Sequence, residues 1–288
     1  MAPPCRDASA PGVRFAKYEG LGNDFLVVDT AEARAAGLTP ADAARVRALC
    51  DRHTGVGADG VLFVDHAAPA MVVRNADGSA AVMCGNGLRC GARYLGATGD
   101  ALTIGTDAGP HEVTLSPDGV NVEVAMAVPR LAPEALPMVL EAPLIGGAFP
   151  LDERTLEATA VSMGNPHLVS FDDVGEERLV LGPALGADPR FPEGVNVGFG
   201  RMGPDAMTLH VFERGSGWTR ACGTGACAAA VAAVETGRWA RGRPLPIDLP
   251  GGRLVLTVGE RDQPVRMRGP ARRVFSGTVE LPATSRSE

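Results

Sequence analysis

One pattern occurs twice in this chain: small and polar residues lead to Cys-Gly-x-Gly, and a helix-like segment follows. The second copy holds Cys222, between a strand-like run at 208–212 and the small apolar residues of 226–234. Alternating β-branched and aromatic residues predict the strand, and the longer apolar run predicts the helix. We therefore expect Cys222 at, or just before, the first residue of a helix.

A cysteine at that position lies beside unpaired backbone N–H groups and the positive end of the helix dipole. A thiol ionises more readily there, and an anion binds easily next to it. This combination suits a cysteine that moves a proton beside a carboxylate.

The first copy is centred on Cys84, which precedes a helix-like segment at 88–97. Asn75 lies nine residues before Cys84, and Glu213 lies nine residues before Cys222. Each cysteine thus follows a polar residue at the same distance, and each is followed by the same glycine spacing. The match indicates two related halves.

A Gly-Asn pair extends the repeat toward the N-terminal side of each half. Asn23 lies 61 residues before Cys84, and Asn165 lies 57 residues before Cys222. Repetition of all three features in one order indicates an internal duplication. Two related halves are expected to face their cysteines across one cleft.

Bulk properties narrow the class of protein. A chain of 288 residues suffices for one large domain or two of ordinary size, and its net charge of −7 argues against broad contact with nucleic acid or anionic lipid. Lys17 is the only lysine and a poor Schiff-base candidate.

Residues 1–12 are not expected to be a signal peptide, and the apolar run near Ala228 is too short to cross a bilayer. Six cysteines without an export signal predict reduced thiols in the cytoplasm.

Many short strands and two buried helices predict an α/β fold of the mixed α+β kind. Thr39 as N-cap and Pro40 as first residue predict one further helix. The apolar segment after Cys222 is expected to be buried on every side, which a mixed, mostly antiparallel sheet wrapped around it would achieve. We expect two pseudo-symmetric domains, at 13–128 with 272–288 returning to it and at 129–271, after a loose tail at 1–12.

Three other interpretations of the cysteines remain. A metal site is the first, but the Cys-x5-Cys and Cys-x4-Cys spacings differ from those of structural zinc, even with His53 or His167 added. A redox dithiol is the second, and the chain contains no Cys-x-x-Cys. The third is a buried hydrophobic role. We expect that third role for four cysteines: Cys5, Cys50, Cys90 and Cys227.

Taken together, the motifs resemble those of the diaminopimelate epimerase family, over nearly the whole chain from about 13 to 277. The segments that carry the resemblance are Gly20-Leu21-Gly22-Asn23-Asp24-Phe25, Asn75-Ala76-Asp77-Gly78-Ser79, Met83-Cys84-Gly85-Asn86-Gly87, Gly164-Asn165-Pro166-His167, Asn196-Val197, Glu213-Arg214-Gly215 and Ala221-Cys222-Gly223-Thr224-Gly225.

The resemblance implies an isomerase that interconverts LL- and meso-2,6-diaminopimelate for lysine and peptidoglycan synthesis, without pyridoxal phosphate or metal. Cys84 resembles the proton donor and Cys222 the acceptor for one direction. Residues of three further kinds complete the implied site. Backbone N–H groups for the reacting carboxylate come from Gly85, Asn86, Gly223 and Thr224; the substrate is held by Asn23, Asn75, Asn165, Asn196, Glu213 and Arg214; and His167 with Glu213 tunes the thiols.

Four positions depart from the family pattern: Gly60, Arg74, Val82 and Trp218. Trp218 is close in sequence to Cys222, so we expect it to affect the cleft and the substrate preference. Phe275 matches an aromatic at a dimer contact in relatives, which predicts a homodimer. Two other functions stay open: another cofactor-independent amino-acid racemase or epimerase, and a non-catalytic amino-acid binding protein. Retention of both cysteines argues against the second.

Overall fold

The computed structural model describes residues 12–81, 84–96, 101–151 and 154–281. Cys5, Val82 and all but the last residue of the predicted tail lie outside the described residues. The chain divides into unit 1, Met1–Val122 with Ala271–Glu288, and unit 2, Glu123–Pro270. The sequence placed the two junctions at 128/129 and 271/272, whereas the structure places them at 122/123 and 270/271.

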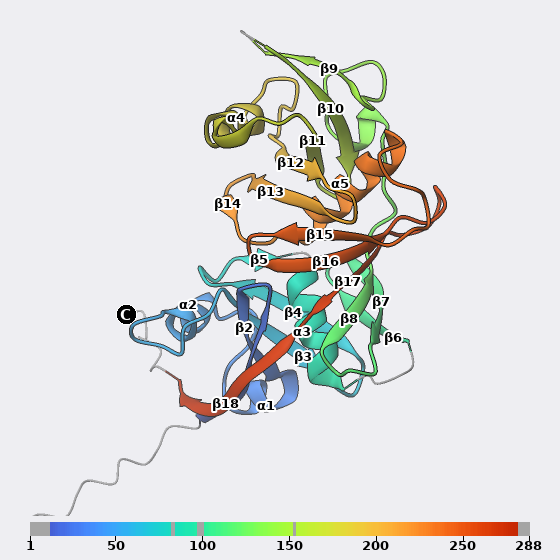
Figure 1. Ribbon diagram of the computed structural model, residues 1–288. Helices are drawn as coiled ribbons and strands as arrows, with labels where there is room; N and C mark the ends of the chain where they lie inside the picture. Colours follow the sequence, from blue (N-terminus) through green and yellow to red (C-terminus); the bar gives the residue numbers. More distant parts are fainter. Residues whose placement is uncertain (1–11, 82–83, 97–100, 152–153, 282–288) are drawn as a thin grey trace, which may run out of the picture. The chain divides into compact units, whose positions relative to one another are not determined.

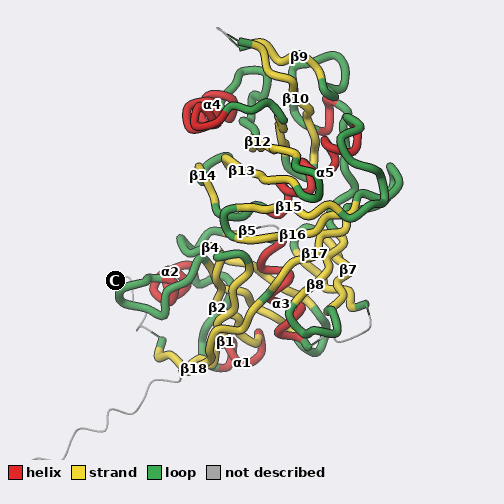
Figure 2. Tube along the Cα trace, viewed as in Figure 1, coloured by secondary structure: helices red, strands yellow, loops and turns green. Residues whose placement is uncertain are grey.

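Unit 1 contains ten strands and helices that precede its junction, and one strand that returns to it after unit 2 (Figures 1 and 2). They are β1 (Gly12–Gly20), β2 (Asn23–Asp29), α1 (Thr30–Ala35), α2 (Ala43–Cys50), β3 (Gly60–Asp65), β4 (Ala70–Asn75), β5 (Ala80–Ala81), α3 (Gly85–Leu95), β6 (Leu102–Thr106), β7 (Gly109–Leu115) and β18 (Arg272–Glu280). A further strand, β8 (Asn121–Ala125), crosses the junction.

Unit 2 repeats this plan with more irregular connections. Its elements are η1 (Pro133–Ala135), β9 (Gly147–Pro150), β10 (Thr155–Ser162), β11 (Pro166–Ser170), η2 (Gly175–Glu177), α4 (Arg178–Gly186), β12 (Asn196–Met202), β13 (Met207–Glu213), β14 (Gly217–Thr219), α5 (Gly223–Glu235), β15 (Leu245–Leu249), β16 (Gly252–Thr257) and β17 (Arg266–Pro270).

The strand pairings of the two units correspond one to one. In unit 1, β18, β1 and β2 are antiparallel neighbours, β2 is parallel to β3, β3 antiparallel to β4, and β4 parallel to β6. In unit 2, β9, β10 and β11 are antiparallel, β11 is parallel to β12, β12 antiparallel to β13, and β13 parallel to β15. This shared order confirms the predicted duplication and the mixed, mostly antiparallel sheets.

Each unit places one helix against several strands of its own sheet. Helix α3 packs against β1, β2, β3, β4 and β7, and α5 packs against β10, β11, β12, β13 and β16. Every residue of α5 from Gly225 to Ala233 is buried. Because these side chains are mostly alanine, the surrounding strands approach the helix closely on all sides. The expected central helix is therefore confirmed in both units.

Several local predictions are wrong. Helix α2 begins at Ala43, and its cap is Asp42, whose carboxylate accepts a hydrogen bond from Arg45 N at 3.0 Å. Thr39 and Pro40 instead belong to a short turn. A hydrogen bond from Asp42 N to Thr39 O, at 3.0 Å, closes this turn. Sequence patterns also missed β9, β14, β15 and α1. Strand β15 carries Pro246, which lowered its apparent strand character.

Candidate active site

Both cysteines are helix N-caps with nearly the same backbone geometry. Cys84 (φ −141°, ψ 108°) caps α3, and Cys222 (φ −123°, ψ 110°) caps α5. Each sulfur accepts a hydrogen bond from the third residue of its helix, at 3.3 Å from Gly87 N and from Gly225 N. The predicted placement is confirmed: each thiol lies at a helix N-terminus, where donors for an anion converge. The expectation that this placement makes Cys222 ionise more readily is wrong, because burial outweighs the hydrogen bonds to its sulfur and raises its pKa.

The second glycine of each Cys-Gly-x-Gly motif is required by space. A Cβ on Gly225 would lie 3.2 Å from Cys222 Sγ and 3.1 Å from the methyl groups of Val211. A Cβ on Gly87 would lie 3.1 Å from Leu62 and 3.4 Å from Cys84 Cβ. Only glycine lets the helix turn bring its N–H this close to the sulfur without displacing a neighbour.

Around Cys84, unit 1 gathers two of the predicted asparagines. The thiol is 3.9 Å from Asn23 Oδ1, and Asn86 Nδ2 donates to the same oxygen at 3.4 Å. Asn86 is buried as the second residue of α3, and Gly85, also buried, is the first. The opening N–H groups of α3 and two amide side chains therefore surround one sulfur.

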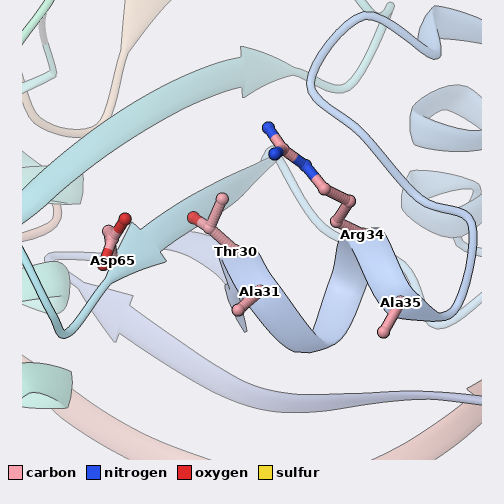
Figure 3. Close-up of a pocket in the computed structure, with 5 residues that line it drawn as sticks. All are labelled: Thr30, Ala31, Arg34, Ala35 and Asp65. Atoms are coloured by element: carbon pink, nitrogen blue, oxygen red, sulfur yellow. The ribbon is translucent and has the colours of Figure 1, made fainter.

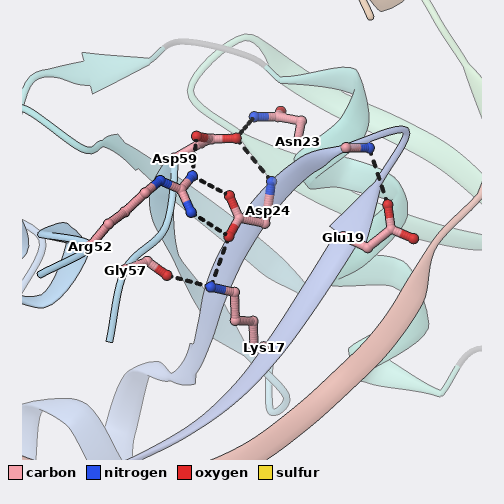
Figure 4. Close-up of polar contacts among 8 residues, drawn as sticks. Lys17, Glu19, Asn23, Asp24, Arg52, Gly57 and Asp59 are labelled. Carbon is pink, nitrogen blue, oxygen red and sulfur yellow. Dashed lines mark hydrogen bonds and ion pairs between the residues drawn. The ribbon is translucent and has the colours of Figure 1, made fainter. Parts of the chain in front are cut away.

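Asn23 is fixed in turn by an ion-pair network at the edge of β2 (Figure 4). Its Nδ2 donates to Asp59 Oδ2 at 2.7 Å, and Arg52 lies 2.7 Å from both Asp59 Oδ1 and Asp24 Oδ1. Lys17 Nζ is 2.8 Å from Asp24 Oδ2. Burial raises the pKa of Asp24, but hydrogen bonds and charges from Arg52 and Lys17 outweigh it and hold that pKa at about 2. Asp24 is thus ionised at neutral pH.

Asn75 lies apart from this group of hydrogen bonds. It is exposed at the end of β4, and its Nδ2 donates to Ser79 Oγ at 2.9 Å within the following turn. Among the bonds found in the described parts of the chain, none joins the Asn75 side chain to Cys84 or Asn23. Its predicted contact with a substrate remains a prediction.

Around Cys222, unit 2 forms a chain of hydrogen bonds from different elements. Thr224 Oγ1 lies 3.5 Å from Cys222 Sγ, and Asn165 Nδ2 donates to Thr224 Oγ1 at 3.5 Å. His167 Nε2 lies 3.0 Å from Asn165 Oδ1. The structure therefore brings together four of the residues predicted for this half, from the β10–β11 turn, β11 and the start of α5.

His167 is neutral in this environment. Burial, followed by the positive charge of Arg214, lowers the pKa of His167 to about 3. A neutral imidazole has one N–H group and one unprotonated nitrogen, so Nε2 can donate to the Asn165 amide or accept from it. His167 therefore contacts Asn165 and adds no positive charge beside the thiol.

Glu213 is an acidic group whose charge acts on Cys222. Burial is the largest cause that raises the pKa of Cys222, and the Glu213 carboxylate raises it further, while Thr224 and Gly225 oppose the change by hydrogen bonding. Thr219 Oγ1 donates to Glu213 Oε1 at 2.5 Å. A carboxylate that favours the protonated thiol makes Cys222 a weaker acid and its thiolate a stronger base toward a substrate proton.

Asn196 and Arg214 are joined to each other. Asn196 is buried; its Nδ2 donates to Pro166 O at 2.9 Å, and its Oδ1 accepts from Arg214 N at 3.0 Å. Arg214 is exposed, and its Nη1 donates to Glu193 O at 2.6 Å. Asn196 therefore fixes the backbone of Arg214, whose guanidinium lies at the surface of unit 2.

The structure explains the residue that is present at two of the four positions that depart from the family pattern, Gly60 and Trp218. A Cβ at Gly60 would lie 2.5 Å from Arg74 O, so a larger residue there requires the backbone to move. Trp218 packs against Phe212 and Phe199, with ring centroids 5.5 Å and 6.3 Å away. Its indole belongs to the hydrophobic core of unit 2, which explains why a large apolar side chain is accommodated at this position.

The remaining described cysteines are structural. Cys50, Cys90 and Cys227 are buried, which confirms the role expected for them, and burial raises the pKa of Cys50 to about 11 and that of Cys90 to about 12. Across the described ranges, no three His, Cys, Asp or Glu side chains gather as an ion would require. Within the same ranges, no helix is both long and apolar enough to traverse a bilayer.

A hollow of about 360 Å³ lies elsewhere in unit 1 (Figure 3). It contains none of the predicted site residues and no nucleophilic thiol. Its lining consists of Thr30, Ala31, Arg34, Ala35 and Asp65.

Four residues of the hydrogen-bond networks were not predicted from the sequence: Arg52, Asp59, Arg89 and Thr219. Arg89 carries the clearest signal, since it is a charged residue between Leu88 and Cys90, and it is fully buried. Asp59 and Thr219 lie in turns or short strands, where their residue types are common and carry no such signal.

Comparison with known proteins adds an independent observation. The family model described as diaminopimelate epimerase matches residues 15–132 and 159–274. Diaminopimelate epimerase 1 of Nostoc sp. is 41% identical over 283 residues, which is 93% of this chain and 99% of the relative. The diaminopimelate epimerase of Synechocystis sp. is 42% identical over 285 residues, with the same two coverages.

Solved structures share the fold at low sequence identity. A PhzF-family phenazine biosynthesis protein from Bacillus anthracis superposes with a TM-score of 0.65 at 16% identity, covering 93% of this chain and 99% of that one. A hydroxyproline epimerase from Agrobacterium vitis superposes with a TM-score of 0.63 at 15% identity, covering 97% and 94%. The two-unit architecture is thus common to several kinds of protein.

Proposed function

The chain belongs to the diaminopimelate epimerase family, and we propose that it interconverts LL- and meso-2,6-diaminopimelate by proton transfer between two cysteines. The observation that carries the proposal is the matched capping of α3 by Cys84 and of α5 by Cys222. The interconversion of these two isomers serves lysine and peptidoglycan synthesis. Relatives that are 41–42% identical over almost their entire length and named for this activity support the assignment.

One thiolate removes the α-proton, and the other thiol delivers a proton to the opposite face of the same carbon. For one direction, Cys222 is the acceptor and Cys84 the donor; the roles exchange for the reverse reaction. As the proton leaves, negative charge develops on the α-carboxylate. Backbone N–H groups of Gly85, Asn86, Gly223 and Thr224 stabilise it, because both helices begin there.

The other predicted residues hold or tune the reactants. Asn23 and Asn165 contact the groups around each sulfur, and Asn75 and Arg214 are exposed and available to the distal amino and carboxylate ends. A guanidinium binds two carboxylate oxygens at once, which suits Arg214 to that end. Asn196 supports Arg214, while His167 and Glu213 set the hydrogen bonding of the second thiol.

The chemistry needs no pyridoxal phosphate in this proposal. Lys17, the only lysine, is paired with Asp24 and also donates to Gly57 O, so its amine is engaged by the ion-pair network. The chain acts in the cytoplasm as a homodimer. Its two epimerase halves lie near 13–128, with 272–288 returning, and 129–271. Val274 and Phe275, exposed on β18, support the dimer contact.

The decisive measurement is exchange of the α-proton of LL-diaminopimelate in deuterated water, followed by NMR without added cofactor. We expect deuterium at the α-carbon and formation of the meso isomer, both of which persist after treatment with a chelator. Exchange that requires added pyridoxal phosphate, or loss of activity restored only by zinc, would contradict the proposal. Absence of exchange with diaminopimelate but exchange with another amino acid would reassign the substrate.

A further inference from the structure

Four side chains of unit 1 form a continuous line of hydrogen bonds that runs past Cys84. Arg89 Nη2 donates to Asn86 Oδ1 at 2.8 Å, and Asn86 Nδ2 donates to Asn23 Oδ1 at 3.4 Å. Asn23 Nδ2 then donates to Asp59 Oδ2 at 2.7 Å. Every bond in the line has the same direction, from Arg89 toward Asp59.

The two end groups determine that direction. A guanidinium can only donate, and an ionised carboxylate can only accept. Asn86 must therefore turn its oxygen toward Arg89, and Asn23 must turn its nitrogen toward Asp59. The remaining nitrogen of Asn86 and oxygen of Asn23 are then left facing each other, which is the one arrangement that completes the line.

The carboxylate end is itself held in place (Figure 4). Asp59 Oδ1 lies 2.7 Å from Arg52, and Asp59 Oδ2 also accepts from Asp24 N at 3.0 Å. The other end is equally constrained, since Arg89 is fully buried and its Nη1 also donates to Gly85 O at 3.4 Å. Neither end can rotate without breaking a charge-assisted hydrogen bond.

We propose that Arg89 and Asp59 are positioning residues that lock both amides, so that Asn23 presents its oxygen, and not its nitrogen, to the thiol of Cys84. This proposal rests on the function proposed above and explains how one half of its site is oriented. The oxygen of Asn23, 3.9 Å from the sulfur, accepts from an S–H group. A reversed amide would instead donate to the sulfur and favour the thiolate. The line therefore favours Cys84 as a proton donor.

A purely structural role explains Arg89 less well. Its side chain is fully buried in the N-terminal half of α3, where a cation gains nothing from the helix dipole. A buried charge is costly unless its bonds are well formed, and apolar residues of similar volume often replace such groups without loss of stability. Its retention is better explained by the direction that it imposes on Asn86.

The second half of the molecule lacks an equivalent lock. Cys227 stands five residues after Cys222, where Arg89 stands five residues after Cys84. Asn165 lies between His167 and Thr224, and both of these can donate or accept a hydrogen bond. The fixed direction is therefore a property of the Cys84 half alone.

The test compares the reactivity of the two thiols in the whole protein without substrate. Iodoacetamide is added at neutral pH, and alkylation of the Cys84 and Cys222 peptides is followed by mass spectrometry. In Asp59→Asn the end group can also donate, so the Asn23 amide is free to reverse. The Cys84 to Cys222 rate ratio should rise about two- to tenfold, the change expected for one hydrogen bond.

Asp24→Asn is the matched control, because it removes the same charge from the same network without freeing Asn23. Its rate ratio should match that of the unaltered protein. A ratio that stays constant in Asp59→Asn, or rises equally in both variants, would overturn the proposal. Because alkylation needs no turnover, this result stands even if diaminopimelate proves not to be the substrate.

A second measurement needs no substitution and does not depend on the folding of a variant. With ¹⁵N-labelled asparagine, the side-chain amide protons of Asn23 should exchange with solvent at least tenfold more slowly than those of exposed Asn75, because the Asn23 amide is half-buried and donates to a carboxylate. Equal exchange rates would show that the Asn23 amide is not locked, and would reject the positioning role.

Discussion

Thr219 Oγ1 lies 2.5 Å from Glu213 Oε1, between neighbouring strands of the β13–β14 hairpin. Glu213 is the carboxylate whose charge raises the pKa of Cys222, so its position decides how strongly it acts on the thiol. The hydroxyl of Thr219 holds one carboxylate oxygen and leaves the other available. A residue outside the recognised motif thus connects the hairpin to the reactive sulfur.

Thr219→Val should therefore reduce catalysis without a large loss of stability. Valine keeps the shape but removes the hydroxyl, and loss of a hydrogen bond to a charged group commonly costs about 1.5–3 kcal/mol, so kcat/KM should fall roughly 10- to 100-fold. Initial rates of epimerisation check this. Thr208→Val, at an exposed position on the neighbouring strand β13, is the matched control. Equal effects of the two substitutions would show that Thr219 does not act through Glu213.

Gly225→Ala should destabilise the protein although alanine favours helices. The helix gain is about 1 kcal/mol, whereas overpacking commonly costs about 1–3 kcal/mol. The new Cβ would lie 3.1 Å from Val211 and 3.2 Å from Cys222 Sγ, so the crowding term should prevail. Denaturant unfolding measures the difference.

Val211→Ala added to Gly225→Ala provides the control for crowding. Removal of the two valine methyl groups opens space at the point of contact, so the double variant should lose less stability than the sum of the single changes. Strict additivity would mean that the two side chains do not compete for the same space, and that the glycine is required for another reason.

The sequence correctly predicted those parts of the fold that depend on local residue patterns. Apolar periodicity and the Cys-Gly-x-Gly spacing identified α3, α5 and the internal duplication. The cap of α2 was assigned to Thr39 because Pro40 commonly begins helices, but the chain makes a turn first, and Asp42 caps the helix. Such a choice between two capping residues depends on packing that a sequence window does not contain.

The hydrogen-bond networks could not be predicted from the sequence, for a different reason. Asp59 and Asn23 are 36 residues apart and meet because β2 and β3 are parallel neighbours. Asn165 and Thr224, 59 residues apart, meet because α5 packs against β10 and β11. The motif predicted which residue types would be present, while the direction of each amide follows from partners that only the folded chain brings together.

Stability should depend on pH through His167. Its pKa is lowered to about 3 from 6.5, so the folded state stays neutral while the unfolded state takes up a proton below pH 6.5. The free energy of unfolding should thus fall as pH decreases from 6.5 toward 3, by up to about 1.4 kcal/mol per pH unit from this group. His167→Gln should flatten this slope. The same change at exposed His53 should leave it unaltered.

The two thiols should be separable by the stereochemistry of a partial reaction. Cys84→Ser and Cys222→Ser should each lose nearly all epimerisation, because a serine hydroxyl is too weak an acid to replace a thiol. Elimination from an analogue with fluorine at the β-carbon needs only removal of the α-proton, so each variant should retain it with one stereoisomer. The variant that keeps Cys222 should act on one α-configuration, and the variant that keeps Cys84 on the other.

Fluoride release from both stereoisomers with both variants provides the measurement. A variant that processes the two stereoisomers equally, or that still epimerises at the normal rate, would show that one cysteine serves both faces and that the two-base mechanism is wrong.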